Sequence, residues 1–293
     1  MAYSKEKNSG QVNPIIDLAL DEDTGHGDVT SEILIPGELR GKATLLVKDE
    51  GVLAGGELAR DIFLRVDPSL KIDLLIKDGT KIKPGDIIGS VSGKVTSILK
   101  AERVVLNFIQ RLSGIASQTA QYIEKTRDCQ AKIVDTRKTT PGLRALEKYA
   151  VRMGGGQNHR MHMGDAVLIK DNHLAALRKL GMGLKEVVGK AKEKAPKGMT
   201  VEVEVTTPEE AREAAEAGAT MIMFDNMSPD EMRRALSLLP KGVKTEASGG
   251  ITLETVRAAA MTGVDIISIG ALTHSVKALD ISLELEAATL KLA

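Results

Sequence analysis

A repeating spacing of short apolar runs limits the folds open to this chain more than any other feature. Four β-type runs begin one after another at intervals of 20–22 residues, at positions 201, 221, 243 and 265. Segments with the apolar spacing of helices lie between them, at 207–218, 228–239 and 252–263. Each segment opens with Ser or Thr ahead of acidic residues, which is typical of a helix N-terminus. The spacing predicts consecutive βα units with parallel strands and right-handed crossovers.

Two earlier β-type runs, at 132–134 and 166–169, bring the expected parallel strands to six. Six units could stay an open doubly wound sheet or close as a short barrel. Polar residues follow most of these runs, and the carboxyl ends of strands are where α/β barrels build their sites. The fold class is therefore expected to be α/β, with a barrel favoured over the open sheet.

The first hundred residues and the last twenty have a different pattern. Runs at 43–48 and 71–76 are expected to be strands, with a helix at 55–66 between them. Apolar and polar residues alternate at 279–285, which predicts a half-exposed strand that returns to an antiparallel sheet of the first domain. We expect a polar tail at 1–10, an N-terminal domain at 11–105 that includes a returning strand near 277–293, and a barrel domain at 106–276.

Several shorter segments have their own signals. Asn13-Pro14 is expected to open a helix, and a long helix is expected at 100–127. The Gly- and Asp-rich segment 21–32 is interpreted as a loop. Segment 78–99 is expected to form short strands, and it resembles the hairpin-rich half of a lipoyl or biotinyl carrier domain. Lys94 would be the modified lysine there, but the Met that usually accompanies it is missing, so the likeness is treated as structural.

Charge and composition exclude several classes of partner. Forty basic residues cancel forty acidic ones, which argues against general binding of nucleic acid or membrane surfaces. Aromatic residues are only 2% of the chain, which disfavours base stacking. The single cysteine, Cys129, allows no internal disulfide and suits a reducing cytosol. The first residues do not resemble a signal peptide and no run of eighteen apolar residues occurs, so we expect a cytoplasmic protein.

A basic group stands out in the stretch 135–173, which also holds three of the five histidines. Two of its members follow the strand at 132–134 and one ends the strand at 166–169, and we expect these strand ends to be neighbours. So much positive charge in one pocket is costly unless an anion neutralises it. The alternative is a set of surface charges paired with nearby aspartates. The group comprises Arg137, Lys138, His159, Arg160 and Lys170.

Two acids end successive strands of the predicted barrel. Glu204 and Asp225 are each flanked by apolar residues, so each is a candidate to bind ribose hydroxyls, hold Mg²⁺ through water or stabilise a cationic carbon. Glu202 has the same strand parity as Glu204 and competes with it. A structural ion pair with a barrel lysine is the alternative for both acids.

Glycines follow three predicted elements. Ser248-Gly249-Gly250 and Gly270 follow the last two strands, and exposed amides before a helix at 252–261 would form a phosphate cradle. The run 154–156 follows a predicted helix at 142–153. It is either the C-cap of that helix or a place where backbone approaches a ligand, and the sequence does not separate the two.

A zinc site made of His159, His162 and His173 is a further possibility. Gly164 and the upstream glycines argue against a helix that would bring the first two imidazoles together. The chain contains no G-x-S-x-G, no Walker loop and no G-x-G-x-x-G after a strand, so serine hydrolase and dinucleotide-binding activities are unsupported.

The motifs together resemble the quinolinate phosphoribosyltransferase family, also called carboxylating nicotinate-nucleotide pyrophosphorylases. The stretches DTRKTTPGLRALEKYAVRMGGGQNHR and DAVLIKDNH are the most specific. EDTGHGDVTSE, AERVVLNFIQRLSGIAS, VEVEV, MFDN, EASGGIT and ISIGALTHSVKALDISL fit the family in the same order. The resemblance covers nearly the whole chain after the first ten residues.

The resemblance implies an N-terminal open α/β sandwich and an incomplete α/β barrel. It implies transfer of phosphoribosyl from 5-phosphoribosyl 1-diphosphate to quinolinate, with release of diphosphate and CO₂ and formation of nicotinate mononucleotide in NAD biosynthesis. Mg²⁺ would be the cofactor, and the enzyme would be a homodimer or a dimer-based hexamer.

By the same resemblance, Arg103 would reach into the partner's site. Lys138, Glu204 and Asp225 would be catalytic, and the two acids would also serve Mg²⁺. His162-Met163 departs from the Gly-Leu usual in the family, and His162 receives no catalytic role. The remaining substrate-binding residues would be Thr136, Arg137, His159, Arg160, Lys170, Ser248, Gly249, Gly250, Ser268, Ile269 and Gly270.

Three rival functions follow from other readings of the same features. A related pyrophosphorylase of the same fold, tied to molybdenum use, would not accept quinolinate. A carrier module built on 78–99 would hold a modified lysine. A zinc hydrolase would contain stoichiometric metal.

Overall fold

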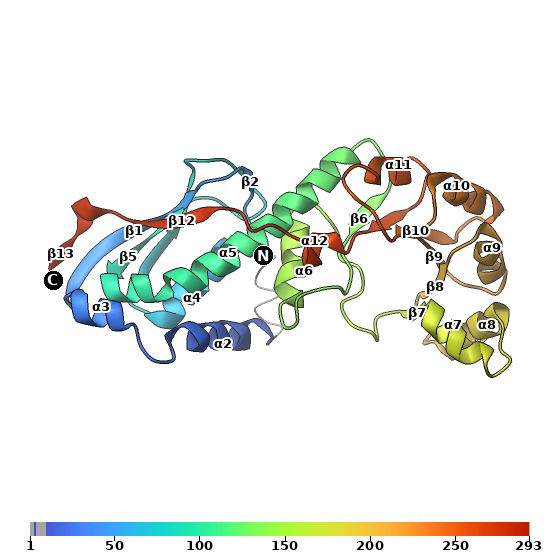
Figure 1. The fold of residues 1–293 in the computed structure, drawn as a ribbon, viewed down its shortest axis with the longest axis horizontal. Coiled ribbons are helices and arrows are strands. Elements are labelled where there is room, and N and C mark those ends of the chain that lie inside the picture. The colour runs from blue at the N-terminus through green and yellow to red at the C-terminus, as the bar shows by residue number, and fades with distance from the viewer. Residues whose placement is uncertain (1–2, 4–9, 293) are drawn as a thin grey trace. The chain divides into compact units, whose positions relative to one another are not determined.

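The computed structural model describes residue 3 and residues 10–292 (Figure 1). The predicted polar tail therefore lies outside the described residues, apart from Tyr3 and Gly10. The chain divides into two compact units, which are described separately. The first comprises Met1–Ala120, Thr139–Gly155 and Ala271–Ala293, and the second comprises Gln121–Lys138 and Gly156–Gly270. The boundaries of these two units differ from those of the predicted domains, which were 11–105 with a returning strand near 277–293, and 106–276.

The first unit is built on an antiparallel sheet with the order β12-β1-β5-β3, to which β13 adds beside β1. The C-terminal strand pairs with β1, as Leu45 opposite Leu283 illustrates, so the predicted returning strand is confirmed. A separate pair is formed by β2 and β4. The strands are β1 (Leu39–Val47), β2 (Gly51–Val52), β3 (Lys71–Leu74), β4 (Lys81–Ile82), β5 (Ile87–Lys94), β12 (Ile281–Leu285) and β13 (Lys291–Leu292).

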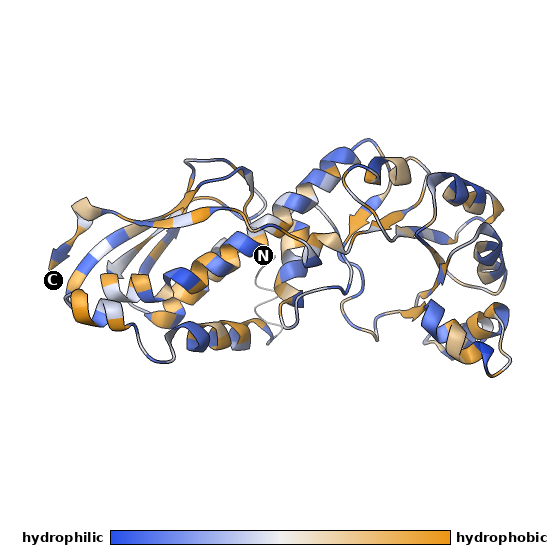
Figure 2. Cartoon of the chain, viewed as in Figure 1, coloured by the Kyte–Doolittle hydropathy of each residue, from blue (hydrophilic) through white to orange (hydrophobic). Residues whose placement is uncertain are grey.

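Helices with one apolar face accompany this sheet. Val12, Ile16 and Leu20 are buried at intervals of four residues along α2, and Figure 2 shows apolar and hydrophilic residues alternating along it. The long helix α5 begins in the first unit and its last residues, from Gln121, belong to the second. The helices are α2 (Val12–Thr24), α3 (Val29–Leu34), α4 (Gly56–Val66), α5 (Val95–Lys125), α6 (Arg144–Met153), α12 (Ala271–His274) and the 3₁₀ turn η1 (Ala287–Thr289).

One prediction for the first unit is wrong, and one rival interpretation is not supported. Segment 21–32 is largely helical, because α2 continues to Thr24 and α3 begins at Val29. The side chain of Asp28 caps α3 by accepting a hydrogen bond from the amide of Ser31 (3.0 Å). The carrier-like interpretation also fails, because Lys94 ends β5 directly before α5 and does not sit on a tight hairpin.

A buried ion pair joins two helices of the first unit. The side chain of Glu147 on α6 is fully buried, and Nη2 of Arg111 on α5 lies 2.5 Å from its Oε1. Its Oε2 accepts the amide hydrogen of Thr140 (3.1 Å). The loop after Lys138 is thus fixed by an ionised group that has most of its hydrogen bonds satisfied.

The glycine run at 154–156 ends α6 as a C-cap. The amide of Gly154 bonds to the carbonyl of Ala150, and Gly155 has a left-handed φ of 90°. A Cβ on Gly154 would lie 2.3 Å from the carbonyl oxygen of Ala116. The cap and the close helix contact account for two of the three glycines.

The second unit contains the six predicted parallel strands, in the order β6-β11-β10-β9-β8-β7. Because β6 pairs with β11, β6 and β7 form the two edges of the sheet and no ladder joins them within the described residues. The barrel is therefore incomplete, and the expectation that β6 and β7 are neighbours is wrong. The strands are β6 (Lys132–Val134), β7 (Val167–Ile169), β8 (Val201–Val205), β9 (Met221–Asp225), β10 (Lys244–Ser248) and β11 (Ile266–Ser268).

Helices follow the strands of the second unit, as the repeat predicts. The side chains of Thr207 and Ser228 accept the N3 amides of α9 and α10, which confirms the predicted N-caps. The last helix is shorter than predicted, because the residues from Thr252 form turns before α11 begins. Across the described residues, no helix is both long and apolar enough to span a membrane. The helices are α7 (Asp171–Arg178), α8 (Leu184–Lys194), α9 (Pro208–Glu216), α10 (Pro229–Leu238) and α11 (Val256–Ala260).

Candidate active site

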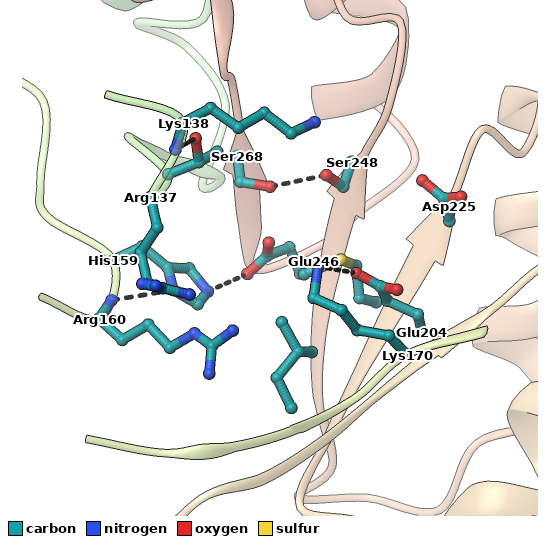
Figure 3. A pocket seen from close by; sticks show the side chains of 13 residues that line it. Arg137, Lys138, His159, Arg160, Lys170, Glu204, Asp225, Glu246, Ser248 and Ser268 are labelled. Atoms are coloured by element: carbon teal, nitrogen blue, oxygen red, sulfur yellow. Dashed lines mark hydrogen bonds and ion pairs between the residues drawn. The ribbon is translucent and has the colours of Figure 1, made fainter. Parts of the chain in front are cut away.

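A pocket of about 260 Å³ lies at the carboxyl ends of the parallel strands in the second unit (Figure 3). All six strands of the sheet, or the loops that follow them, contribute to it. Its lining is mostly charged, with basic and acidic residues both present. The lining residues are Thr136, Arg137, Lys138, His159, Arg160, Leu168, Lys170, Glu204, Met223, Asp225, Glu246, Ser248 and Ser268.

Strand alternation delivers the acids to this pocket. Glu202 and Glu204 lie on one face of β8, with buried valines on the other face. Glu246 and Ser248 share a face of β10 in the same way. The register places Glu246 opposite Met223 on β9. In each pair the residue nearer the strand end is the more exposed, so the pocket has a buried acid layer beneath its mouth.

Two guanidinium groups lie on one side of the pocket. Arg137 follows β6 and Arg160 precedes β7, and Figure 3 shows them beside His159. Burial, and then the charge of Arg137, lower the pKa of Arg160 from its usual range. The carbonyl of Ala166 accepts a hydrogen bond from Nη1 of Arg160 (3.3 Å). An anion with two carboxylates would relieve the repulsion between the guanidiniums.

Lys170 and Glu204 form an ion pair across the pocket mouth. The Nζ atom of Lys170 lies 3.3 Å from Oε1 of Glu204, and the lysine side chain is 44% exposed. Lys170 is also the N-cap residue of α7. The pair therefore links the end of β7 to the end of β8, and each partner can exchange the other for an incoming ligand.

His159 is held by acids on its backbone and on its ring. Its amide donates to Oδ1 of buried Asp135 (2.9 Å). Its Nε2 lies 3.0 Å from Oε2 of Glu246 and 3.6 Å from Oε2 of Glu202, and its side chain is only 14% exposed. Burial lowers the pKa of His159, but the two carboxylates outweigh burial and raise it to about 10. For the carboxyl of Glu202 burial has the opposite effect and raises the pKa.

The contact at Nδ1 of His159 favours the neutral ring, whereas the raised pKa favours the imidazolium. The amide of Arg160 points at Nδ1 of His159 (2.9 Å), and an imidazolium would place two N–H groups against each other there. Nε2 carries hydrogen in either state, since Nδ1 is the acceptor in the neutral ring. Nε2 therefore faces the two acids in either charge state, whereas the contact of Nδ1 with the Arg160 amide requires the neutral ring.

The glycine turn after β10 is shaped by close packing. Gly249 has φ +84°, and a Cβ on it would lie 2.5 Å from Oδ1 of Asn226, which itself has φ 54°. The amide of Asn226 donates to the carbonyl of Ser248 (2.9 Å), and Oγ of Ser268 donates to Oγ of Ser248 (3.0 Å). The predicted cradle at a helix N-terminus is not formed as expected, because α11 begins only at Val256.

The pocket brings together most of the predicted site residues. Those that do not line it are Arg103, which is exposed on α5 of the first unit, together with Gly249, Gly250, Ile269 and Gly270. The sequence prediction missed Glu246, Met223 and Leu168. Glu246 could have been found from strand parity, because it stands two residues before Ser248 on the same strand.

The three central histidines do not gather. Among the described residues, the group around His159 that could hold a metal contains Glu202 and Glu246 instead. His162 is exposed. Nδ1 of His173 accepts the amide of Lys170 (3.0 Å) at the start of α7. His173 thus caps a helix, and the described residues do not form the histidine triad that was considered as a possible zinc site.

Comparison with known proteins gives a family for both units. The family model "Quinolinate phosphoribosyl transferase, C-terminal domain" matches residues 115–284, and the corresponding N-terminal domain matches residues 28–113. The chain is 47% identical to a probable nicotinate-nucleotide pyrophosphorylase [carboxylating] of Bacillus subtilis, over 94% of each chain. It is 46% identical to a mitochondrial quinolinate phosphoribosyltransferase [decarboxylating] of Nicotiana glauca, over 93% of this chain and 81% of that protein.

Solved structures agree with the sequence matches. The crystal structure of NadC from Streptococcus pyogenes superposes with a TM-score of 0.88 at 41% identity, covering 94% of this chain and 96% of the other. The agreement extends over both units and includes the incomplete barrel that holds the pocket. The chain belongs to the quinolinate phosphoribosyl transferase family.

Proposed function

We propose that this protein transfers the 5-phosphoribosyl group of 5-phosphoribosyl 1-diphosphate to the nitrogen of quinolinate. The reaction releases diphosphate and CO₂ and yields nicotinate mononucleotide for NAD biosynthesis. Family membership supports the reaction class, and the similar proteins from Bacillus subtilis and Nicotiana glauca carry names for this activity. The observation that carries the proposal is the pocket itself, in which paired guanidiniums face acids at strand ends.

The guanidinium side of the pocket suits the two carboxylates of quinolinate. Arg137 and Arg160 can each grip a carboxylate with two parallel hydrogen bonds. Lys138 lines the same pocket next to Arg137, and we assign it to the space between the two substrates. The partial burial of Arg160 strengthens its attraction for a bound anion.

The acid side suits the ribose and a hard cation. Glu204 and Asp225 end the adjacent strands β8 and β9, and carboxylate oxygens are donors that fit Mg²⁺. They would hold Mg²⁺ largely through water, and bound Mg²⁺ would neutralise the departing diphosphate. We assign phosphate and phosphoribosyl contacts to Thr136, Ser248, Gly249, Gly250, Ser268, Ile269 and Gly270, and we assign Lys170 to the dicarboxylate side of the pocket with His159.

Positioning and neutralisation account for the chemistry without a covalent intermediate on the enzyme. The bond from ribose C1 to diphosphate breaks, and the resulting oxocarbenium-like centre is stabilised by the carboxylates of Glu204 and Asp225. The pyridine nitrogen then forms the new bond to C1. The adjacent carboxylate leaves as CO₂, its electron pair stays on the ring carbon beside N⁺, and that carbon takes a proton.

The oligomer is part of the proposal. Arg103 is exposed on α5 in the first unit. We propose that it serves the site of a partner in a homodimer or a dimer-based hexamer. A cytoplasmic location is likewise proposed, on the single cysteine.

One assay tests the proposed function. Purified protein is mixed with quinolinate, 5-phosphoribosyl 1-diphosphate and Mg²⁺, and nicotinate mononucleotide, diphosphate and CO₂ are measured together in equal amounts. Diphosphate release that requires a different acceptor, with no CO₂ from quinolinate, would instead indicate a related pyrophosphorylase of the same fold. Gel filtration with light scattering tests the dimer, and mixing Arg103→Ala subunits with subunits mutated at Lys138 tests whether activity is restored by complementary sites.

A further inference from the structure

The acids around His159 are more deeply buried than a pocket for anions requires. The side chain of Glu246, which lines a pocket that should attract anions, is fully buried, and that of Glu202 is 1% exposed. Their Oε2 atoms flank Nε2 of His159. Their Oε1 atoms are buried and have no hydrogen-bond partner among the described residues. Two half-satisfied carboxylates are costly to bury, so folding alone does not explain them.

The contacts form a chain from the sheet to the guanidinium side of the pocket. Glu246 accepts from Nε2 of His159, and Nδ1 of the same ring accepts the backbone amide of Arg160. Asp135 fixes the backbone of His159 from the other direction. Both ring nitrogens are therefore hydrogen-bonded to protein atoms, and the orientation of the ring helps to hold the backbone amide of Arg160 in place.

We propose that Glu246, assisted by Glu202, is a positioning residue that fixes the His159 ring and, through it, Arg160 on the quinolinate side of the pocket. This inference rests on the proposed function and deepens it. Glu246 acts through hydrogen-bond geometry on the inner strand β10, so its effect is confined to the acceptor substrate. Binding of 5-phosphoribosyl 1-diphosphate, on the acid side, does not depend on it.

A metal ion is the competing occupant of the same three side chains. One imidazole nitrogen and two carboxylates, with ligand atoms within 4.8 Å of one another, form a donor set of the kind that binds divalent metals. The geometry favours positioning, because Nε2 already lies at hydrogen-bond distance from Glu246 and the guanidinium of Arg160 contributes positive charge near Glu202. Elemental analysis of the purified protein distinguishes the two.

The test uses two variants of Glu246 and one matched control. Glu246→Met keeps the volume but removes the acceptor, whereas Glu246→Gln keeps a carbonyl oxygen that can still accept from Nε2. Glu213→Gln changes an exposed acid on α9, away from the pocket. KM for each substrate, kcat and Tm are measured for all three. The ¹⁵N signals of His159, assigned by comparison with His159→Asn, report the ring in the absence of turnover.

The expected pattern separates positioning from structural support. Glu246→Met raises KM for quinolinate at least ~10-fold, since the loss of one charge-assisted hydrogen bond corresponds to that change, and leaves KM for the other substrate within about twofold. Glu246→Gln recovers most of the loss, Tm does not fall in either variant, and the ¹⁵N signals of His159 shift in Glu246→Met.

Three results would overturn the inference: equal rises in both KM values, unchanged His159 signals, or a metal bound stoichiometrically in wild type and lost in Glu246→Met. A wild-type protein that makes no nicotinate mononucleotide would reject the proposed function alone. The ¹⁵N signals would still decide whether Glu246 positions the ring.

Discussion

The Nζ atom of Lys170 lies 3.3 Å from Oε1 of Glu204 across the mouth of the pocket. One partner ends an edge strand of the sheet and the other ends an inner strand. Neither side chain is deeply buried, so each can turn to a substrate while the other compensates. In the absence of substrates, the two side chains thus neutralise each other in place of the charges that the ligands would bring.

Lys170→Ala is expected to lower kcat/KM by at least ~100-fold, because it removes a preorganised cation and leaves Glu204 without its counter-charge in the pocket. Steady-state kinetics with both substrates measure the change. Lys185→Ala, on the exposed face of α8, is the control and should stay within twofold of wild type. Equal kinetics for the two variants would show that Lys170 serves only the ion pair.

Arg137→Ala and Lys138→Ala are each expected to lower turnover by at least ~100-fold, since both remove a charge from the centre of the pocket. Arg137→Lys should recover only part of the loss, because an ammonium cannot grip a carboxylate bidentately. The exposed Lys132→Ala, at the start of β6, provides the control. Near-wild-type formation of nicotinate mononucleotide by either alanine variant would contradict the assignment.

Gly249→Ala is expected to destabilise the protein and to raise KM for 5-phosphoribosyl 1-diphosphate. A left-handed φ costs any L-residue about 1 kcal/mol, and here the added Cβ also collides with Asn226. Gly242→Ala isolates the backbone cost, because Gly242 has φ +95° and nothing within 4 Å of the added atom. Denaturant unfolding should therefore show a larger loss for Gly249→Ala, and similar losses would mean that Asn226 moves aside.

Glu147→Ala is expected to lower the free energy of unfolding by about 3–5 kcal/mol, because it leaves Arg111 without its buried partner and the amide of Thr140 without its acceptor. Urea titration followed by circular dichroism measures the loss. Arg233→Ala, which breaks an exposed pair with Asp230, should change stability by less than ~0.5 kcal/mol. A small effect at Glu147 would indicate that water takes over the role of its carboxylate.

Asp265 is expected to make the stability of the folded protein depend on pH in the acidic range. Burial raises the pKa of its carboxyl, but hydrogen bonds from Thr245 and Lys244 outweigh burial and lower it below the usual value. A lowered folded-state pKa contributes stability above the unfolded pKa, and that contribution disappears as pH falls through the folded value. The Tm difference between wild type and Asp265→Asn should be constant above about pH 5 and narrow below about pH 4. A difference that is constant down to pH 3 would contradict this.

The strand rhythm was sufficient to predict the six parallel strands and the return of β12, because both depend on local periodicity. Capping residues such as Ser228 made two helix starts predictable for the same reason. Strand parity placed Glu204 at a strand end but did not rank it against Glu202. Only the depth of each side chain in the folded sheet does that.

Features that depend on distant pairing were not predictable. The positions of β6 and β7 at opposite edges follow from the pairing of β6 with β11, which lies far along the chain. The helix at Val29 was hidden by a Gly- and Asp-rich composition that usually indicates loops, although Asp28 is its cap. Strand parity points to Glu246, but its contact with His159 was not predictable, because that contact joins residues 87 positions apart.

The placement of charge in the sheet has a mechanical consequence. Glu204 and Asp225 stand on strands with a hydrogen-bonded neighbour on each side, whereas Arg137 and Lys170 follow the two edge strands. Moving an inner strand would break hydrogen bonds to two neighbouring strands, whereas moving an edge strand would break hydrogen bonds to only one. The half of the pocket assigned to 5-phosphoribosyl 1-diphosphate is therefore more rigid than the half assigned to quinolinate. Variation at the edges could retune the choice of acid substrate while leaving the sugar-phosphate chemistry intact.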